Sequence, residues 1–189
     1  LNIGPNDDVN MSQSSNDVIP TAIKISAHID LTKKLYPALD KLINEIQKKA
    51  KSLKGVTKTG RTHLMDAMPI DFSDELLAWS SQLSACRNML EVIEGRFLEL
   101  PQGGTAVGSG INAHKQFAKF FAQEMSKILE TKRKYIPSNN FFHELSAQDC
   151  SVQLSGELKN LAVILMKISN DLRCMNSGPL AGLSEIELH

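Results

Sequence analysis

The chain has 189 residues, of which 42% are apolar, 22% charged and 5% aromatic. Its 21 basic and 21 acidic residues leave no formal net charge, which argues against a general nucleic-acid binder because such proteins usually carry a basic excess. The length and composition fit one domain with a sizeable core and exclude a disordered or disulfide-stapled chain. The longest wholly apolar run, Leu161–Met166, is far too short to span a membrane.

The three cysteines, Cys86, Cys150 and Cys174, cannot all form disulfides with one another. We therefore expect reduced thiols in an intracellular protein, located in the cytoplasm or, in a eukaryote, in the mitochondrial matrix. The chain begins inside a polar segment without an initiator methionine, so we expect it to be a fragment of a longer protein.

The first half of the chain predicts a polar entry segment followed by long helices. Residues 1–21 contain three Asp and no Lys or Arg and are expected to form a loop or a helix entry. A helix is expected over about Ala22–Leu53, whose inward face is formed by Leu35, Leu39, Leu42, Ile46 and Leu53. The segment Gly55–Pro69 interrupts the helical pattern.

The most regular pattern starts at Phe72, where apolar residues recur at alternate spacings of four and three as far as Leu100. This heptad seam predicts a long helix with Asp71 as its N-cap and Pro101 at its end. The seam consists of Phe72, Leu76, Trp79, Leu83, Cys86, Leu90, Ile93, Phe97 and Leu100.

Two further helices are predicted in the second half. The shorter runs over about Ala113–Glu130 with Phe117, Phe120, Phe121 and Ile128 facing inward. The longer runs from about Phe142 to Met175 and carries a second heptad seam, formed by Leu154, Leu158, Leu161, Leu165, Ile168, Leu172 and Met175. No strand-like alternation is evident. Apolar seams of this length need more partners than one chain supplies, so we predict an all-α, elongated bundle of long antiparallel helices that assembles into an oligomer.

Two polar breaks are candidates for chemistry. At the first, Ser14, Ser15 and Asn16 lie at the entry to a helix, where hydroxyl, amide and helix N–H groups form either an anion cradle or an N-cap cluster without a ligand. At the second, Gly60–Ala67, His63 is either a proton-transfer group near neutral pH or an ordinary turn residue.

The remaining motifs give weaker signals. The glycine-rich segment Gly103–Gly110 resembles a nucleotide-binding loop only in composition, because it follows a predicted helix and lacks the GxGxxG spacing. A tight helix-to-helix turn is the preferred interpretation. The five histidines show no pairing at i, i+3 or i+4, so a helical zinc site is unsupported and no metal is expected.

Several of these segments together resemble the class II fumarases of the fumarase/aspartase superfamily. The strings that carry the resemblance are PNDDVN (5–10) with SQSSND (12–17), GRTHLMDA (60–67), GGTAVGSG (103–110), LMKISND (165–171) and SGP (177–179). They occur in the family's order across essentially the whole chain. The resemblance implies the central helical domain of the fold, a tetramer with a multi-helix core, and a cofactor-free hydro-lyase that interconverts fumarate and (S)-malate.

The resemblance also implies roles for individual residues. Ser14, Ser15 and Asn16 would donate hydrogen bonds to a carboxylate of the dicarboxylate substrate, and Thr62 would contact the same ligand. His63 would act on the acid side of the reaction, handling the water or hydroxyl that is added or lost. Preorganised donors suit this chemistry because removal of the proton next to a carboxylate generates a dianionic aci-carboxylate.

A second, non-catalytic dicarboxylate site would involve Gly4, Pro5, Asn6 and Asp7. Gly4 occupies a position where the family usually has a histidine. The family's proton-accepting serine lies on a loop of the form GSSxMPxKxN, which these 189 residues do not contain. We expect the family's N-terminal and C-terminal domains to lie outside this fragment as well. Because the family's active sites combine residues from three subunits, we expect the isolated fragment to be inactive.

Two alternatives remain open. An aspartate ammonia-lyase of the same superfamily is disfavoured by His63, where aspartases have Gln, and by Ser15, where they have Thr. The other alternative is a non-catalytic helical module that serves only in oligomerisation.

Overall fold

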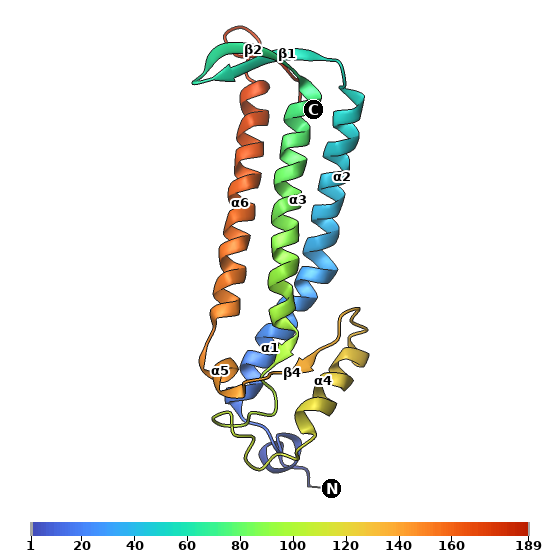
Figure 1. Ribbon diagram of the computed structural model, residues 1–189, viewed down its shortest axis with the longest axis vertical. Coiled ribbons are helices and arrows are strands. Elements are labelled where there is room, and N and C mark those ends of the chain that lie inside the picture. Colours follow the sequence, from blue (N-terminus) through green and yellow to red (C-terminus); the bar gives the residue numbers. More distant parts are fainter. Residues whose placement is uncertain (1, 189) are drawn as a thin grey trace. The chain divides into compact units, whose positions relative to one another are not determined.

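The computed structural model describes residues 2–188 and shows a mostly helical chain (Figure 1). The helices are α1 (Ser15–Asp30), α2 (Tyr36–Ser52), α3 (Phe72–Phe97), α4 (Phe117–Ile128), α5 (Phe141–Ser146) and α6 (Asp149–Met175), with π-helical segments η1 (Pro5–Val9) and η2 (Leu31–Leu35). The strands are β1 (Thr57–Thr62), β2 (Met65–Asp71), β3 (Glu99–Leu100) and β4 (Ile136–Pro137). The predicted helical class is confirmed, whereas the expected absence of strands is wrong. None of the helices within residues 2–188 is long and apolar enough to cross a membrane.

The chain divides into two compact units, each built from two separate stretches of sequence. Unit 1 comprises residues 1–35 and 91–154, and unit 2 comprises residues 36–90 and 155–189. Both α3 and α6 therefore contribute residues to both units.

In unit 1, a small apolar core lies where α4 packs against the strand pair β3–β4. Leu98, Leu100, Ala122 and Tyr135 are buried there, and part of the side chain of Phe121 joins them. Strands β3 and β4 pair in parallel over Glu99–Leu100 and Ile136–Pro137. This arrangement brings the chain segment after α3 next to the segment before α5.

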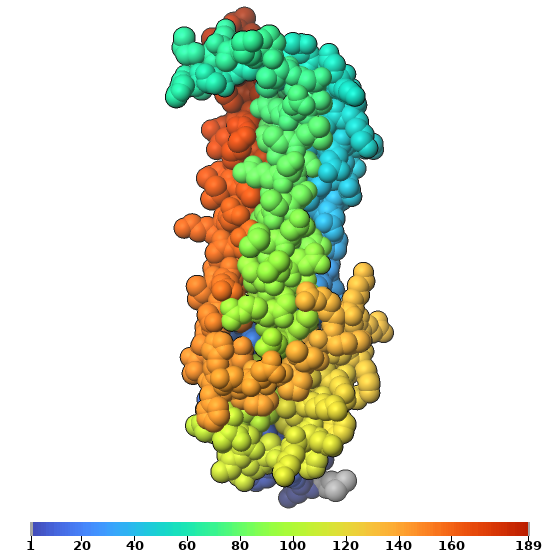
Figure 2. All heavy atoms as spheres, viewed as in Figure 1, coloured from blue at the N-terminus to red at the C-terminus, as the bar shows by residue number. Residues whose placement is uncertain are grey.

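In unit 2, α2, α3 and α6 lie side by side, with α3 antiparallel to both neighbours (Figures 1 and 2). The seam on α3 supplies the core, because Leu76, Trp79, Leu83, Cys86 and Leu90 are all buried. As predicted, Asp71 caps α3: its Oδ1 accepts a hydrogen bond from the backbone N–H of Ser73 at 2.8 Å. The regular spacing of the apolar residues therefore translates directly into packing along α3. The helix ends at Phe97 rather than at Pro101, however, and Leu100, the last residue of the predicted seam, lies in β3.

The segment predicted only as an interruption forms an antiparallel β-hairpin. Strands β1 and β2 pair from Thr57–Asp71 to Thr62–Met65, with an irregularity after Thr59. At this irregularity a Cβ on Gly60 would lie 2.4 Å from the carbonyl oxygen of Met68, so only glycine allows the backbones to approach this closely.

Two details of the other helices also differ from the predictions. Phe120 and Ile128 are 50% and 71% exposed rather than buried, because α4 turns Ala122 and Ser126 inward instead. The long final helix is divided into α5 and α6, since Ala147 adopts an extended conformation after α5.

Candidate functional site

The first candidate group lies at the N-terminus of α1, where a capping box fixes the backbone. The Ser14 side chain accepts a hydrogen bond from the backbone N–H of Asn16 at 3.2 Å, and Asp17 accepts one from the backbone N–H of Ser14 at 2.9 Å. These reciprocal bonds satisfy N–H groups that the helix itself leaves unpaired. The S-x-x-D spacing in the sequence is the signal that could have identified this box.

The capping arrangement leaves hydrogen-bond donors available at the surface. Ser14 uses its oxygen as an acceptor, so its hydroxyl hydrogen is free to donate. Ser15 is exposed, and its hydroxyl makes no hydrogen bond within residues 2–188. Asn16 donates one amide hydrogen to the carbonyl oxygen of Ala106 at 2.8 Å, which leaves its second amide hydrogen available. These three consecutive residues therefore offer hydrogen-bond donors of the kind that a carboxylate accepts.

The glycine-rich turn packs against this group. Ser12 donates to the carbonyl oxygen of Asn112 at 3.2 Å, in addition to the bond between Asn16 and Ala106. Gly103 has a φ of +106°, and a Cβ there would lie 2.6 Å from the Cβ of Ala118. The segment connects β3 to α4, so the predicted tight helix-to-helix turn is wrong about what precedes it. The backbone is nevertheless tightly packed at Gly103, and the segment supports the α1 entry.

The second candidate group lies at the tip of the β1–β2 hairpin. Thr62 ends β1, and His63 and Leu64 form the two-residue connection with φ values of +51° and +62°. Two successive positive φ values are typical of the type I′ turn, in which non-glycine residues are strained. Thr62 and His63 are both exposed, so the turn presents the imidazole to solvent.

An ion-pair cluster holds strand β1 of the hairpin within unit 2. The carboxylate of Glu185 lies 2.7 Å from Arg61 and 3.2 Å from Lys58, and Lys58 also pairs with Glu75 on α3. Glu185 in turn is fixed by its backbone N–H, which donates to the carbonyl oxygen of Met175 at 2.8 Å. These contacts join β1 to α3 and to the segment after α6. Sequence reasoning did not identify Glu185.

A cavity of about 750 Å³ lies beside the hairpin in unit 2. Its lining includes Val56, Phe72 and Leu172, but neither Thr62 nor His63. We therefore assign it no part in the site.

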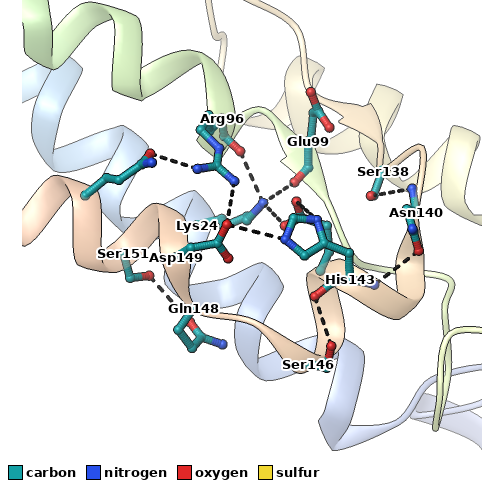
Figure 3. Close-up of polar contacts among 12 residues, drawn as sticks. Lys24, Arg96, Glu99, Ser138, Asn140, His143, Ser146, Gln148, Asp149 and Ser151 are labelled. Carbon is teal, nitrogen blue, oxygen red and sulfur yellow. Dashed lines mark hydrogen bonds and ion pairs between the residues drawn. The ribbon is translucent and has the colours of Figure 1, made fainter.

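A buried polar cluster lies deeper in unit 1 (Figure 3). Lys24, whose side chain is 3% exposed, pairs with Glu144 and donates to the carbonyl oxygens of Arg96 and Glu99 at 3.1 and 2.8 Å. These carbonyls lie at and just beyond the end of α3, where a helix lacks internal partners. The ammonium group of Lys24 therefore joins α1, α5 and the end of α3.

At the edge of the same cluster, Asp149 pairs with Arg96 at 2.9 Å and lies 3.4 Å from His143. The hydrogen bond from Arg96 holds the pKa of Asp149 below its usual value. This exposed pair fixes the start of α6 (Figure 3).

His28 occupies a second buried cluster in unit 1. Its Nδ1 lies 2.7 Å from the Tyr135 hydroxyl, and its Nε2 lies 3.5 Å from Glu94, which also contacts Arg133 at 3.3 Å. Burial lowers the pKa of His28 even though Glu94 opposes the shift. Burial also raises the pKa of Tyr135 to about 12. These groups connect α1 to the segment that follows α4 and play no part in the surface site.

The segment expected to form a second dicarboxylate site is η1 with its preceding residue. Gly4 donates its backbone N–H to Asp8 at 2.7 Å, and Pro5 begins the π-helical segment. Asn6 and Asp7 are exposed. A role for this segment in ligand binding stays a prediction.

The structure thus distributes the predicted site residues over the two units. Ser14, Ser15 and Asn16 belong to unit 1, and Thr62 and His63 belong to unit 2. Among residues 2–188, no three His, Cys, Asp or Glu side chains are grouped as metal ligands.

Comparisons with known proteins identify the family to which the chain belongs. The family model described as lyase matches residues 1–189, and the chain therefore belongs to this lyase family. The chain is 50% identical over 186 residues to fumarate hydratase class II 2 of Pseudomonas aeruginosa and 52% identical to fumarate hydratase class II of Xylella fastidiosa. Each alignment covers 98% of this chain but only 40% and 39% of the relative, respectively.

Solved structures agree with these relatives. A class II fumarase from Schistosoma mansoni superposes with a TM-score of 0.90 at 36% identity, covering 97% of this chain and 41% of that one. A fumarate lyase:delta crystallin from Brucella melitensis, bound to cobalt, gives a TM-score of 0.92 at 40% identity over 99% of this chain and 40% of that one. The predicted family and the predicted match to its helical domain are confirmed.

Proposed function

We propose that this chain is the central helical segment of a class II fumarate hydratase, which interconverts fumarate and (S)-malate by reversible hydration. The observation that carries the proposal is the set of available donor hydrogens on Ser14, Ser15 and Asn16, beside a capping box in a chain of this family. Thr62 and His63 at the hairpin tip of another subunit supply the second part of the machinery in this proposal.

The proposed reaction divides the work between the two groups. In the dehydration direction, a base removes a proton from the carbon next to one carboxylate of malate, and the resulting negative charge spreads onto that carboxylate. Hydrogen bonds from Ser14, Ser15 and Asn16 stabilise this charge. His63 donates a proton to the departing hydroxyl, which leaves as water, and the double bond of fumarate forms. The proton acceptor comes from a segment outside this chain.

We also propose that the protein is a homotetramer in the cytoplasm. Support for assembly comes from the seam of α6, where Leu158 and Leu165 remain 40% and 36% exposed although Leu161 and Ile168 are buried. Three unpaired cysteines support a reducing compartment. Light scattering at micromolar concentration is expected to give four copies, and a monomer would contradict the proposed assembly.

The activity is tested with purified full-length protein that contains this segment. The ultraviolet absorbance of fumarate is expected to fall in water alone; a requirement for ammonium would identify an ammonia-lyase instead. His63→Asn is expected to lower kcat by about 10²- to 10⁴-fold. The matched control is His114→Asn, at an exposed histidine in unit 1. Unchanged hydration by the His63 variant would overturn the role of His63. The isolated 189-residue chain is expected to be inactive.

A further inference from the structure

Asp17 stands out because its side chain is 0% exposed and yet forms no ion pair within residues 2–188. Its charge is compensated by backbone groups alone. One oxygen, Oδ1, accepts from the N–H of Ser14 at 2.9 Å; the other, Oδ2, accepts from the N–H groups of Gly103 and Thr105 at 3.0 and 2.9 Å. Such charge-assisted bonds are strong and directional, and they offset the cost of burying the carboxylate.

The two oxygens of the Asp17 carboxylate bind two different segments of the chain. Oδ1 belongs to the capping box, whereas Oδ2 holds the glycine-rich turn that follows α3. Thr105, which donates to Oδ2, has a φ of +57°, a strained value for a residue with a branched Cβ. The bond to Asp17 helps to hold the turn in this conformation.

The glycine-rich turn also holds Asn16, one of the proposed substrate donors. The carbonyl oxygen of Ala106, one residue after Thr105, accepts the bond from the Asn16 side chain. Asn16 is also the neighbour of Asp17 on α1. Asp17 therefore controls the direction of the donors twice, through the cap that contains Ser14 and through the turn that holds Asn16.

We infer that Asp17 is a positioning residue, which aligns the Ser14–Asn16 donors with the substrate carboxylate by anchoring the glycine-rich turn. This inference rests on the proposed function. Asp17 touches no substrate itself. Its carboxylate is required because three N–H donors converge on it, and an amide would direct its own N–H groups toward at least one of them.

The experiment measures fumarate hydration in the full-length protein that contains this segment, with the variants Asp17→Asn, Ser15→Ala and the combination of both. Asp17→Asn is expected to lower kcat/KM by about 10- to 100-fold, the effect of misplaced catalytic donors. The double variant is expected to lose less than the product of the two single losses, because both changes impair the same donor set. Asp30→Asn, at an exposed carboxylate on the same helix, is the matched control and is expected to retain the parent rate.

A second readout is independent of activity. In the 189-residue chain, Asp17→Asn is expected to accelerate hydrogen exchange at the amides of Gly103 and Thr105 while the thermal transition of the protein persists. Asp17→Ser keeps a short acceptor for the cap, so it serves as a second variant if the asparagine variant does not fold.

The outcomes separate the two proposals. A parent protein without fumarate hydration would overturn the proposed function and, with it, the role of Asp17 in that reaction. An active parent whose Asp17 variants keep its kcat/KM, or whose losses multiply in the double variant, would overturn the positioning role alone. Failure of both Asp17 variants to fold would also overturn it, because Asp17 would then serve the stability of the fold.

Discussion

The buried pair between Lys24 and Glu144 offers a sharp test of what stabilises unit 1. Replacing Lys24 by Met keeps an unbranched side chain of similar length but removes the ammonium group. The change removes the ammonium partner of the Glu144 carboxylate, which is 11% exposed and then keeps only a 3.8 Å contact to His143 among its described ion pairs. It also leaves the carbonyl oxygens of Arg96 and Glu99 without this donor. A buried charge and unpaired acceptors are both costly, because water cannot replace the lost contacts.

The expected magnitude follows from this geometry. Removing one partner of a buried ion pair costs about 3–5 kcal/mol of unfolding free energy, whereas an exposed pair contributes below about 1 kcal/mol. Lys34 and Asp30 form such an exposed pair on the same stretch of chain, with side chains 75% and 63% exposed. Lys34→Met is therefore a matched control. For a chain of this length, about 4 kcal/mol corresponds to a fall in Tm of roughly 10 °C.

The assay is urea unfolding of the 189-residue chain, followed by circular dichroism, for Lys24→Met, Glu144→Met, the double variant and Lys34→Met. The double variant is expected to be more stable than the sum of the single losses implies, with a coupling of about 1–3 kcal/mol. A loss for Lys24→Met no larger than that for Lys34→Met would refute the assignment of a stabilising buried pair.

Three further predictions concern other parts of the chain. Leu83→Ala, at a side chain that is 0% exposed on α3, is expected to cost about 3–5 kcal/mol in urea unfolding, whereas Leu77→Ala, at a position 43% exposed, costs much less; equal losses would contradict the seam. Burial lowers the pKa of His28, so as the pH falls His28 is protonated in the unfolded state before it is protonated in the folded state, and the unfolding free energy is expected to fall as the pH drops below about 6.5. In His28→Gln this decline between about pH 7.5 and 5.5 is expected to be shallower. Parallel curves of unfolding free energy against pH for the two proteins would contradict the role of His28. Glu185→Gln weakens the contacts to Lys58 and Arg61 and is expected to accelerate hydrogen exchange in β1. Unchanged exchange in β1 would contradict a stabilising role of the Glu185 ion pairs.

Regular packing was predictable from the sequence wherever one helical face is buried. The α3 seam shows this, because Leu76, Trp79 and Leu83 lie in the core and Asp71 caps the helix where expected. Apolar residues recur at helical spacing because only one face of the helix is buried. The same reasoning failed for Phe120, since Ser126 takes an inward position on α4 by accepting from the N–H of Tyr135 at 2.9 Å.

The hairpin escaped prediction for a different reason. Nearly every residue of β2 is exposed, so its side chains need not alternate between polar and apolar. The turn uses His63 and Leu64 instead of Asn-Gly, the pair that typically signals a type I′ connection. Proposed site residues occupy this irregular position, and local sequence rules often fail at functional sites.

The supporting residues were the hardest to identify from sequence. The capping-box spacing identifies Asp17 as a partner of Ser14, but it does not reveal the bond to Gly103. Glu185 reads as an ordinary acidic residue, and its partner Arg61 lies far along the chain. Contacts over such separations follow from the fold and leave no local pattern. The donor residues themselves, by contrast, were found through motifs that are contiguous in sequence.

The interleaving of the two units has a consequence for biosynthesis. Unit 1 is interrupted by residues 36–90, and unit 2 by residues 91–154. A ribosome delivers the chain from its N-terminus, so α1 leaves the exit tunnel well before α5 and the start of α6 exist to cover Lys24 and its neighbours. Neither unit can complete its core until most of the chain has been made, and contacts between such distant segments form slowly. Neither unit is therefore expected to fold before most of these 189 residues have left the exit tunnel, and until then the face of α1 that the fold buries stays exposed.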